Sequence, residues 1–243
     1  MIELFPEGFE ELEAHDGLEL VAYTDARGEE RLWQVFGAGR VEEIDQGWEE
    51  RWRHFHRPVR VGPFWIGPPW ETAPDDVIAV VVDPGAAFGT GAHPTTRLAI
   101  ELLATLQPGS LLDIGCGSGV VAIAAAKLGF APVAGIDLEP QAIAATVRNA
   151  AANGVSVDAR CADAREAELP PAQVTVANIT LASVEALAER VSSERLVTSG
   201  YLASDEPALP GWERLERREL DGWAADLHRP AVRPSAPNRH TAT

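Results

Sequence analysis

Residues 111–119 read Leu-Leu-Asp-Ile-Gly-Cys-Gly-Ser-Gly, and this stretch decides the fold. An apolar run typical of a buried strand enters a turn with three glycines, and residues 120–128 predict a helix after it. Residues 133–137, Val-Ala-Gly-Ile-Asp, predict a second strand that ends in a carboxylate. A nucleoside lying across two parallel strand ends needs this arrangement, because glycines admit the ligand and the acid accepts hydrogen bonds from ribose.

Two classes of nucleoside cofactor could explain the glycine turn. A dinucleotide fingerprint needs a small sixth residue, but this position is Val120, and the third glycine comes one place early at Gly119. Asp113 stands two residues before Gly115, and a carboxylate there repels a phosphate but suits the ammonium of S-adenosylmethionine. The pattern, with Gly117 in its centre, therefore favours an S-adenosylmethionine-dependent methyltransferase. A turn that binds no ligand is the third interpretation.

Length and composition set the broad class. The 243 residues are 46% apolar, which is enough for one good core and a small appendage. No apolar run reaches the roughly 18 residues of a membrane span, and the first residues show no signal sequence, so we expect a cytoplasmic protein without a membrane partner. Two cysteines occur, Cys116 and Cys161, and neither has metal-ligand spacing, so we expect no metal.

The charge is acidic and uneven. The formal net charge is −17, and residues 1–57 hold 15 acidic side chains against six arginines. This balance argues against direct binding of nucleic acid, because phosphates require a basic surface. It suits a basic protein partner, although a generally acidic proteome explains the charge equally well.

Strand and helix patterns alternate along most of the chain. We expect strands at residues 64–66, 77–83, 110–115, 133–137, 157–161, 174–178 and 196–199, and helices at 95–106, 118–128, 140–153 and 181–191. Residues 212–220 and 223–228 predict a closing antiparallel pair. Such alternation with short connections predicts an α/β fold with a doubly wound, mostly parallel sheet.

The chain divides into four predicted parts. Residues 1–45 form a small acidic domain with weak strand signals at 18–23 and 31–36. Residues 46–60 form a linker helix, and residues 61–229 form the main domain. Residues 230–243 predict a disordered tail, because they have no acid and no apolar pattern.

Polar residues follow four of the predicted parallel strands. They are Asp113, Asp137 as the ribose acceptor, Asp163 beside the adenine amine, and Asn178 facing the transferable methyl group. Ligands in an open parallel sheet lie beyond the carboxyl ends of the strands. A single acid at a strand end is usually a helix cap, but four polar residues in register predict a site.

A longer segment carries a family resemblance. Residues 83–98 read Asp-Pro-Gly-Ala-Ala-Phe-Gly-Thr-Gly-Ala-His-Pro-Thr-Thr-Arg-Leu. This segment closely resembles the loop before the first core helix in the ribosomal protein L11 methyltransferase (PrmA) family. Residues 113–119, 135–142 and 176–179 agree with that family, residues 48–59 are similar to its linker helix, and the match covers roughly residues 46–202.

The resemblance implies a function and a set of contacts. It implies a Rossmann-like class I methyltransferase core with a seven-stranded sheet, behind a small N-terminal α+β recognition domain. The activity implied is methylation of lysine and N-terminal amines on a basic ribosomal protein, by a monomer. The cofactor contacts implied are Thr96, Gly115, Asp137 and Asn178, with the Phe88 loop folded over the cofactor. The recognition domain is shorter than in the family, and residues 192–195 lack its usual Pro-Gly-Gly turn.

Methyl transfer to an amine depends on positioning and on a neutral nucleophile. Asn178 is the predicted catalytic residue that orients the amine, and His93 is the candidate proton acceptor. A methyltransferase for another protein or a small molecule remains an alternative, as does a non-catalytic cofactor-binding module. A nucleic-acid adenine methyltransferase is disfavoured, because Ile-Thr-Leu follows Asn178 where Pro-Pro and an aromatic residue are expected.

Overall fold

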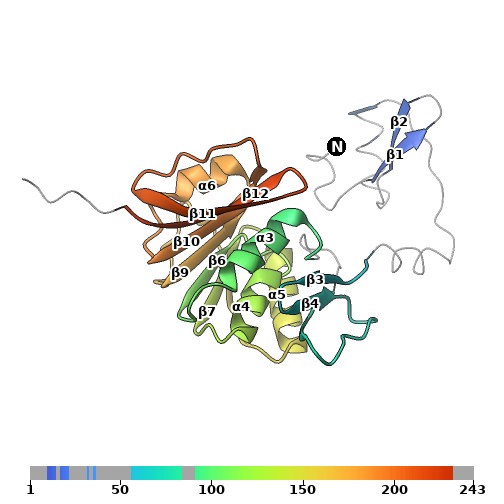
Figure 1. Cartoon of the computed structure of the whole chain (residues 1–243), viewed down its shortest axis with the longest axis horizontal. Helices are drawn as coiled ribbons and strands as arrows, with labels where there is room; N and C mark the ends of the chain where they lie inside the picture. The colour runs from blue at the N-terminus through green and yellow to red at the C-terminus, as the bar shows by residue number, and fades with distance from the viewer. Residues whose placement is uncertain are drawn as a thin grey trace, which may run out of the picture.

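The computed structural model describes residues 10–14, 17–21, 32, 35–36, 56–83 and 91–231. Its centre is a seven-stranded sheet with strand order β11-β12-β10-β9-β6-β7-β8 (Figure 1). The strands are β6 (Leu111–Ile114), β7 (Val133–Asp137), β8 (Asp158–Cys161), β9 (Val174–Asn178), β10 (Arg195–Leu202), β11 (Trp212–Leu220) and β12 (Trp223–Pro230). Only β12 among them runs against its neighbours, so the predicted mostly parallel sheet and its closing antiparallel pair are confirmed.

Helices cover both faces of the sheet, as a doubly wound fold requires. One face packs against α3 (Pro94–Leu103), α4 (Val120–Lys127) and α5 (Pro140–Ala152), and the other packs against α6 (Leu181–Leu187) (Figure 1). In α4 the first six residues are all buried, which explains why this helix is apolar on every side. The central strands are buried on both faces and therefore lack the alternating pattern of a half-exposed sheet.

A three-stranded sheet precedes the main one. It consists of β3 (Val59–Val61), β4 (Phe64–Gly67) and β5 (Ile78–Val81), and it packs Phe64 and Ile66 into the core beneath α3 and α4. The strands predicted at 64–66 and 77–83 are confirmed. The sequence predicted a linker helix as far as residue 60, but residues 59 and 60 belong to β3, because pairing with β4 places them in a ladder.

The described part of the N-terminal region contains both strand and helix. Strands β1 (Glu10–Ala14) and β2 (Gly17–Val21) form an antiparallel pair, and β2 overlaps the predicted strand at 18–23. The strand predicted at 31–36 is wrong at Leu32, Val35 and Phe36, where the backbone is helical. These three apolar residues are spaced by three and one, which is a helical period. Residues 46–55 of the linker helix predicted at 46–60 lie outside the described residues, as do residues 232–243 of the tail predicted at 230–243. The predicted start of the tail is wrong at Pro230, which belongs to β12.

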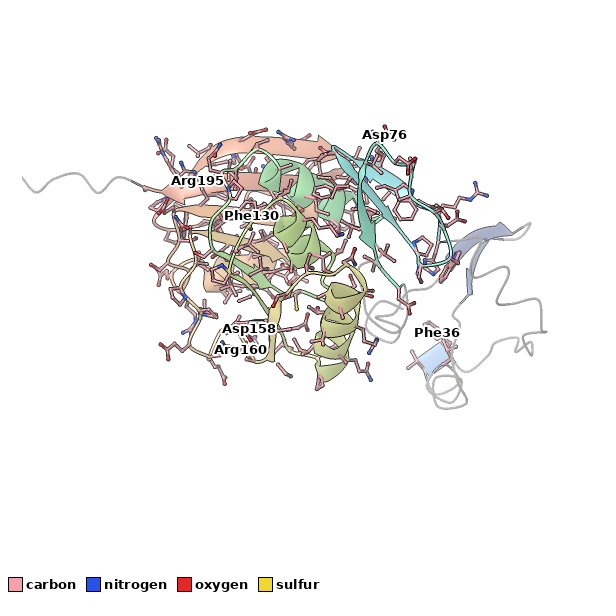
Figure 2. The ribbon with its side chains drawn as sticks, turned by 90° about the horizontal axis from the view of Figure 1, so that it is seen from below. Phe36, Asp76, Phe130, Asp158, Arg160 and Arg195 are labelled. Atoms are coloured by element: carbon pink, nitrogen blue, oxygen red, sulfur yellow. The ribbon has the colours of Figure 1, made fainter. Side chains whose placement is uncertain are left out.

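Both edges of the large sheet carry charged side chains. Asp158 and Arg160 form an ion pair on edge strand β8 and lie at the margin of the molecule (Figure 2). On the opposite edge, β11 carries Glu213, Arg214, Glu216, Arg217, Arg218 and Glu219. Charged edges discourage pairing with a strand of another molecule.

Candidate functional site

The predicted residues lie where the parallel strands reach their carboxyl ends. We call this end of the sheet, which is distinct from its outer strands β8 and β11, the carboxyl edge. Ile114 of β6 lies opposite Ile136 of β7 and Ala177 of β9. The next residue on each strand is therefore level with the others, and these residues are Gly115, Asp137 and Asn178. The predicted level of Asp137 and Asn178 is confirmed, whereas Asp113 lies opposite Gly135 and Val176 and is therefore two residues short of this level.

The glycine loop between β6 and α4 takes a conformation that other residues strain to adopt. Gly115, Gly117 and Gly119 have φ angles of 74°, 53° and 82°. A Cβ atom on Gly115 would lie 2.3 Å from the Cγ2 atom of Ile179, and one on Gly119 would lie 3.0 Å from the side chain of Thr146. The first and third glycines are therefore required by neighbouring side chains within the fold, in addition to any need for a ligand to approach.

Asp113 is turned into the protein. Its side chain is 2% exposed, and Oδ2 accepts a hydrogen bond from the backbone N–H of Ala122 at 3.2 Å. Ala122 lies in the first turn of α4, whose N-cap, Gly119, has no side chain to supply this bond. Burial, with a smaller contribution from the charge of nearby Asp137, raises the pKa of Asp113 to about 7 against the lowering effect of the Ala122 N–H. The hydrogen bond of Asp113 is thus to the first turn of α4, and its predicted ion pair with a cofactor ammonium stays a prediction.

Asp137 joins the tip of β7 to the glycine loop. Its Oδ2 accepts from the N–H of Gly117 at 2.9 Å, and its Oδ1 accepts from the N–H of Glu139 at 3.0 Å. The side chain is only partly buried. Each carboxylate oxygen has a second lone pair, so the group retains acceptors for hydroxyl donors.

Asp163 is engaged with a neighbouring arginine. The guanidinium of Arg165 donates to both of its carboxylate oxygens, at 3.0 Å from Nε and 2.7 Å from Nη2. These bonds, and a further one from the Arg165 backbone, lower the pKa of Asp163 to about 2. Asp163 lies two residues beyond the end of β8, and its predicted contact with adenine stays a prediction.

Asn178 contacts a residue that the sequence places 82 positions away. Its Nδ2 donates to Oγ1 of Thr96 at 3.2 Å, and Thr96 is 2% exposed in the first turn of α3. The bond fixes which way the amide of Asn178 faces, because Nδ2 points to α3. The structure therefore brings together two of the residues that the family resemblance implied.

His93 acts as the N-cap of α3. Its Nδ1 accepts from the N–H of Thr95 at 3.4 Å, and its ring lies edge-on to Trp223 with centroids 4.8 Å apart. Burial lowers the pKa of His93, which favours the neutral ring. Nδ1 also lies 2.8 Å from Oγ1 of Thr95, so this nitrogen is engaged with the first turn of α3. The structure therefore shows His93 as the N-cap of α3, and its role as proton acceptor stays a prediction.

Phe88 lies outside the described residues, and its predicted place over the cofactor stays a prediction. Sequence reasoning missed other residues, namely Thr146, Asn149 and Asn153 on α5 and Trp223 on β12. Polar residues at three- and four-residue spacing on an alanine-rich helix were a usable signal for the three on α5. Nothing in the local sequence pairs Trp223 with His93.

Other features of the described residues lie away from the carboxyl edge. A hollow of about 490 Å³ is lined by residues of the α6–β10 connection and the start of β11, including Glu189 and Trp212. None of the predicted site residues lines it. No three His, Cys, Asp or Glu side chains gather as metal ligands in the described ranges, and no helix there has the length and apolar character to cross a bilayer.

The strand order, the single reversed strand β12, the glycine loop after β6 and the acid at the tip of β7 define the fold of a class I methyltransferase. Members of this class use S-adenosylmethionine. The chain belongs to the ribosomal protein L11 methyltransferase family (PrmA), whose sequence profile matches residues 11–205.

Individual relatives agree with this assignment. The chain is 48% identical over 130 residues to the ribosomal protein L11 methyltransferase of Serratia proteamaculans, covering 50% of this chain and 44% of that protein. It is 43% identical over 143 residues to the corresponding protein of Actinobacillus pleuropneumoniae, covering 57% and 49%. The chain thus spans about half the length of the curated relatives it matches.

One solved structure is similar over most of the described fold. The crystal structure of a ribosomal protein L11 methylase from Lactobacillus delbrueckii subsp. bulgaricus has a TM-score of 0.67 and 25% identity, covering 73% of this chain and all of that one. The expected fold class and family are confirmed.

Proposed function

We propose that this chain is an S-adenosylmethionine-dependent N-methyltransferase that methylates lysine and N-terminal amines of ribosomal protein L11. The observation that carries the proposal is the level placement of Gly115, Asp137 and Asn178 at the carboxyl edge. An open backbone turn, an acid and an amide at neighbouring strand ends match the needs of a nucleoside cofactor and an amine acceptor.

The residues present fit the cofactor. The turn at Gly115 and Gly117 has no Cβ atoms to keep the ligand from the backbone, and Asp137 keeps lone pairs for the ribose hydroxyls. Asp163 is the proposed contact for the adenine amine, Phe88 for the methionine end, and Thr96 acts through Asn178. Asp113 and Gly119 shape the loop. When bound, the cofactor supplies an electrophilic methyl group on a sulfonium centre.

The acceptor amine must lose its proton before it attacks. A free lysine has a pKa of about 10.4, and removal from water lowers the pKa of an amine. Asn178 Oδ1 accepts an N–H of the amine, because Nδ2 of the same amide is held by Thr96 Oγ1 at 3.2 Å. This orients the nitrogen lone pair. We assign His93 to capping α3, and the proton passes to water.

The substrate assignment rests on family membership and on charge. The chain carries a net charge of −17, which attracts a basic ribosomal protein and repels nucleic acid. We further propose that residues 1–45 recognise this substrate, that residues 46–60 link them to a catalytic domain at 61–229, and that the enzyme acts as a cytoplasmic monomer.

Two measurements on the purified protein test the proposal. Calorimetry measures the binding of S-adenosylmethionine, and radiolabelled methyl transfer into large-subunit ribosomal proteins, resolved by mass, identifies the acceptor. Asp137→Ala should weaken cofactor binding by more than about tenfold, a loss of 1.4 kcal/mol or more. Asp158→Ala removes an exposed acid from the edge strand β8 and is the matched control.

Each result has a distinct meaning. No cofactor binding by the unaltered protein refutes the proposed activity. Binding with label on a protein other than L11, or only on a small molecule, keeps the chemistry and replaces the substrate. If the Asp137→Ala and Asp158→Ala variants bind S-adenosylmethionine equally well, the proposed contact between Asp137 and the ribose is refuted.

A further inference from the structure

Helix α5 turns three polar side chains toward the protein. Thr146, Asn149 and Asn153 are spaced by three and four residues, so they lie on one face of the helix. Thr146 is fully buried and Asn149 is 4% exposed. Burying a polar side chain costs free energy unless it is hydrogen-bonded, so the partners of these groups indicate what they do.

The first two residues hold the glycine loop by its carbonyl groups. Thr146 Oγ1 donates to the carbonyl oxygen of Gly117 at 3.0 Å, and Asn149 Nδ2 donates to that of Ser118 at 2.8 Å. Two successive peptide units of the loop are therefore turned toward α5. On the other side of Gly117, its N–H is held by Asp137. The loop is thus fixed through both donors and acceptors.

Asn149 makes a second contact, to a different part of the chain. Its Oδ1 accepts from the backbone N–H of Asp83 at 3.2 Å. Asp83 is the last described residue before residues 84–90, which include Phe88, and it is the first residue of the segment 83–98. One amide therefore bridges the glycine loop and the start of the segment that most closely resembles the family.

Asn153 offers a comparison one helical turn away. Its Oδ1 accepts from the N–H of Val81 at 2.9 Å and its Nδ2 donates to the carbonyl of Val81 at 2.6 Å. The amide pairs with strand β5 as a neighbouring strand does. It holds the small sheet to α5 and makes no contact with the glycine loop among its hydrogen bonds.

We propose that Asn149 is a positioning residue, which sets the glycine loop and Asp83 at a fixed separation. Asparagine suits this role because one planar side chain presents a donor to Ser118 and an acceptor to Asp83. Alanine leaves both backbone groups without this partner. Cofactor affinity and acceptor KM therefore depend on Asn149, whereas Asn153 serves only the stability of the fold. This inference rests on the proposed function.

The test compares Asn149→Ala with Asn153→Ala in the full chain. Calorimetry gives the Kd of S-adenosylmethionine, and methyl transfer gives kcat and the KM for the acceptor protein. We expect Asn149→Ala to raise the cofactor Kd by about tenfold and to raise the acceptor KM, because the loss of a well-placed hydrogen bond changes an equilibrium by about that factor. We expect Asn153→Ala to lower the melting temperature but to leave the Kd within about twofold.

Asn149→Asp provides a readout that a purely structural role does not move. A carboxylate keeps the acceptor for the Asp83 N–H but loses the donor to Ser118, and it regains an O–H donor when protonated. Burial raises the pKa of such a group. The ratio of the cofactor Kd of this variant to that of the unaltered protein should therefore fall toward one as the pH is lowered from 8.5 to 6.

The outcomes are separable. If the unaltered protein binds cofactor and the Asn149 and Asn153 variants lose stability alike with unchanged Kd, Asn149 is structural and the inference is wrong. The inference is also wrong if the ratio of the cofactor Kd of Asn149→Asp to that of the unaltered protein does not vary with pH. If Asn149→Ala does not fold, the Asn149→Asp variant provides the test. If the unaltered protein does not bind S-adenosylmethionine, the proposed function fails first and the inference fails with it.

Discussion

Replacing Asp113 by asparagine tests the electrostatics beneath the glycine loop. The carboxylate is 2% exposed and burial raises its pKa from 3.8 to about 7. The unfolded chain releases this proton near pH 4, whereas the folded chain retains it until about pH 7. Over that interval the folded state binds more protons, so the free energy of unfolding falls as the pH rises. Three pKa units correspond to about 4 kcal/mol, of which about 2 kcal/mol falls between pH 5.5 and 8.5.

The assay is urea unfolding at these two pH values. Asp113→Asn stays neutral and keeps an oxygen for the Ala122 N–H, so its stability relative to the unaltered protein should rise by about 2 kcal/mol from pH 5.5 to 8.5. Asp76→Asn is the control, because that side chain is 71% exposed and lies at the periphery (Figure 2). The reasoning is refuted if the free energy of unfolding differs between Asp113→Asn and the unaltered protein by the same amount at both pH values. That result means that Asp113 is hydrated in the folded state.

Two further substitutions, one of them with a control variant, address strand β10. Gly200 has φ +100°, and a Cβ atom there would lie 2.0 Å from the carbonyl oxygen of Ile179, so Gly200→Ala should cost roughly 2–4 kcal/mol in urea unfolding. Gly211→Ala, with φ +82° and open space around it, should cost clearly less, and equal losses contradict the steric argument. Tyr201→Phe removes a 2.9 Å bond to the buried Asp226 and should cost about 1–3 kcal/mol; a loss below 0.5 kcal/mol means that water replaces the hydroxyl.

The sheet and its order of elements were predictable because strand and helix patterns alternate over most of the chain. The segments at 133–137 and 174–178 match β7 and β9 at both ends, since apolar runs there stop at a polar residue. The same logic placed Asp137 and Asn178 at one level. Parallel strands of similar length bring their carboxyl ends together, so sequence spacing is sufficient for this part of the site.

The direction of individual side chains was not predictable. A central strand is buried on both faces, so the pattern of β6 could not tell whether Asp113 faces a ligand or α4. Asp163 forms its ion pair with Arg165, only two residues on, which a list of strand-end acids overlooks. The packing of Trp223 on His93 and the bridge at Asn149 depend on residues brought together by tertiary structure. For these contacts, the neighbouring sequence does not predict which residue is the partner.

The place of β12 has a consequence for how the protein is made. This strand is the last of the described elements along the chain, yet it lies inside the sheet between β10 and β11 (Figure 1). It also supplies Trp223, the ring that packs against His93 at the start of α3. A growing chain that ends before β12 leaves one edge of β10 unpaired, and an unpaired strand invites association with other chains. We therefore expect chains that stop before residue 223 to lack the strand that covers β10, and to aggregate more readily than chains that include it.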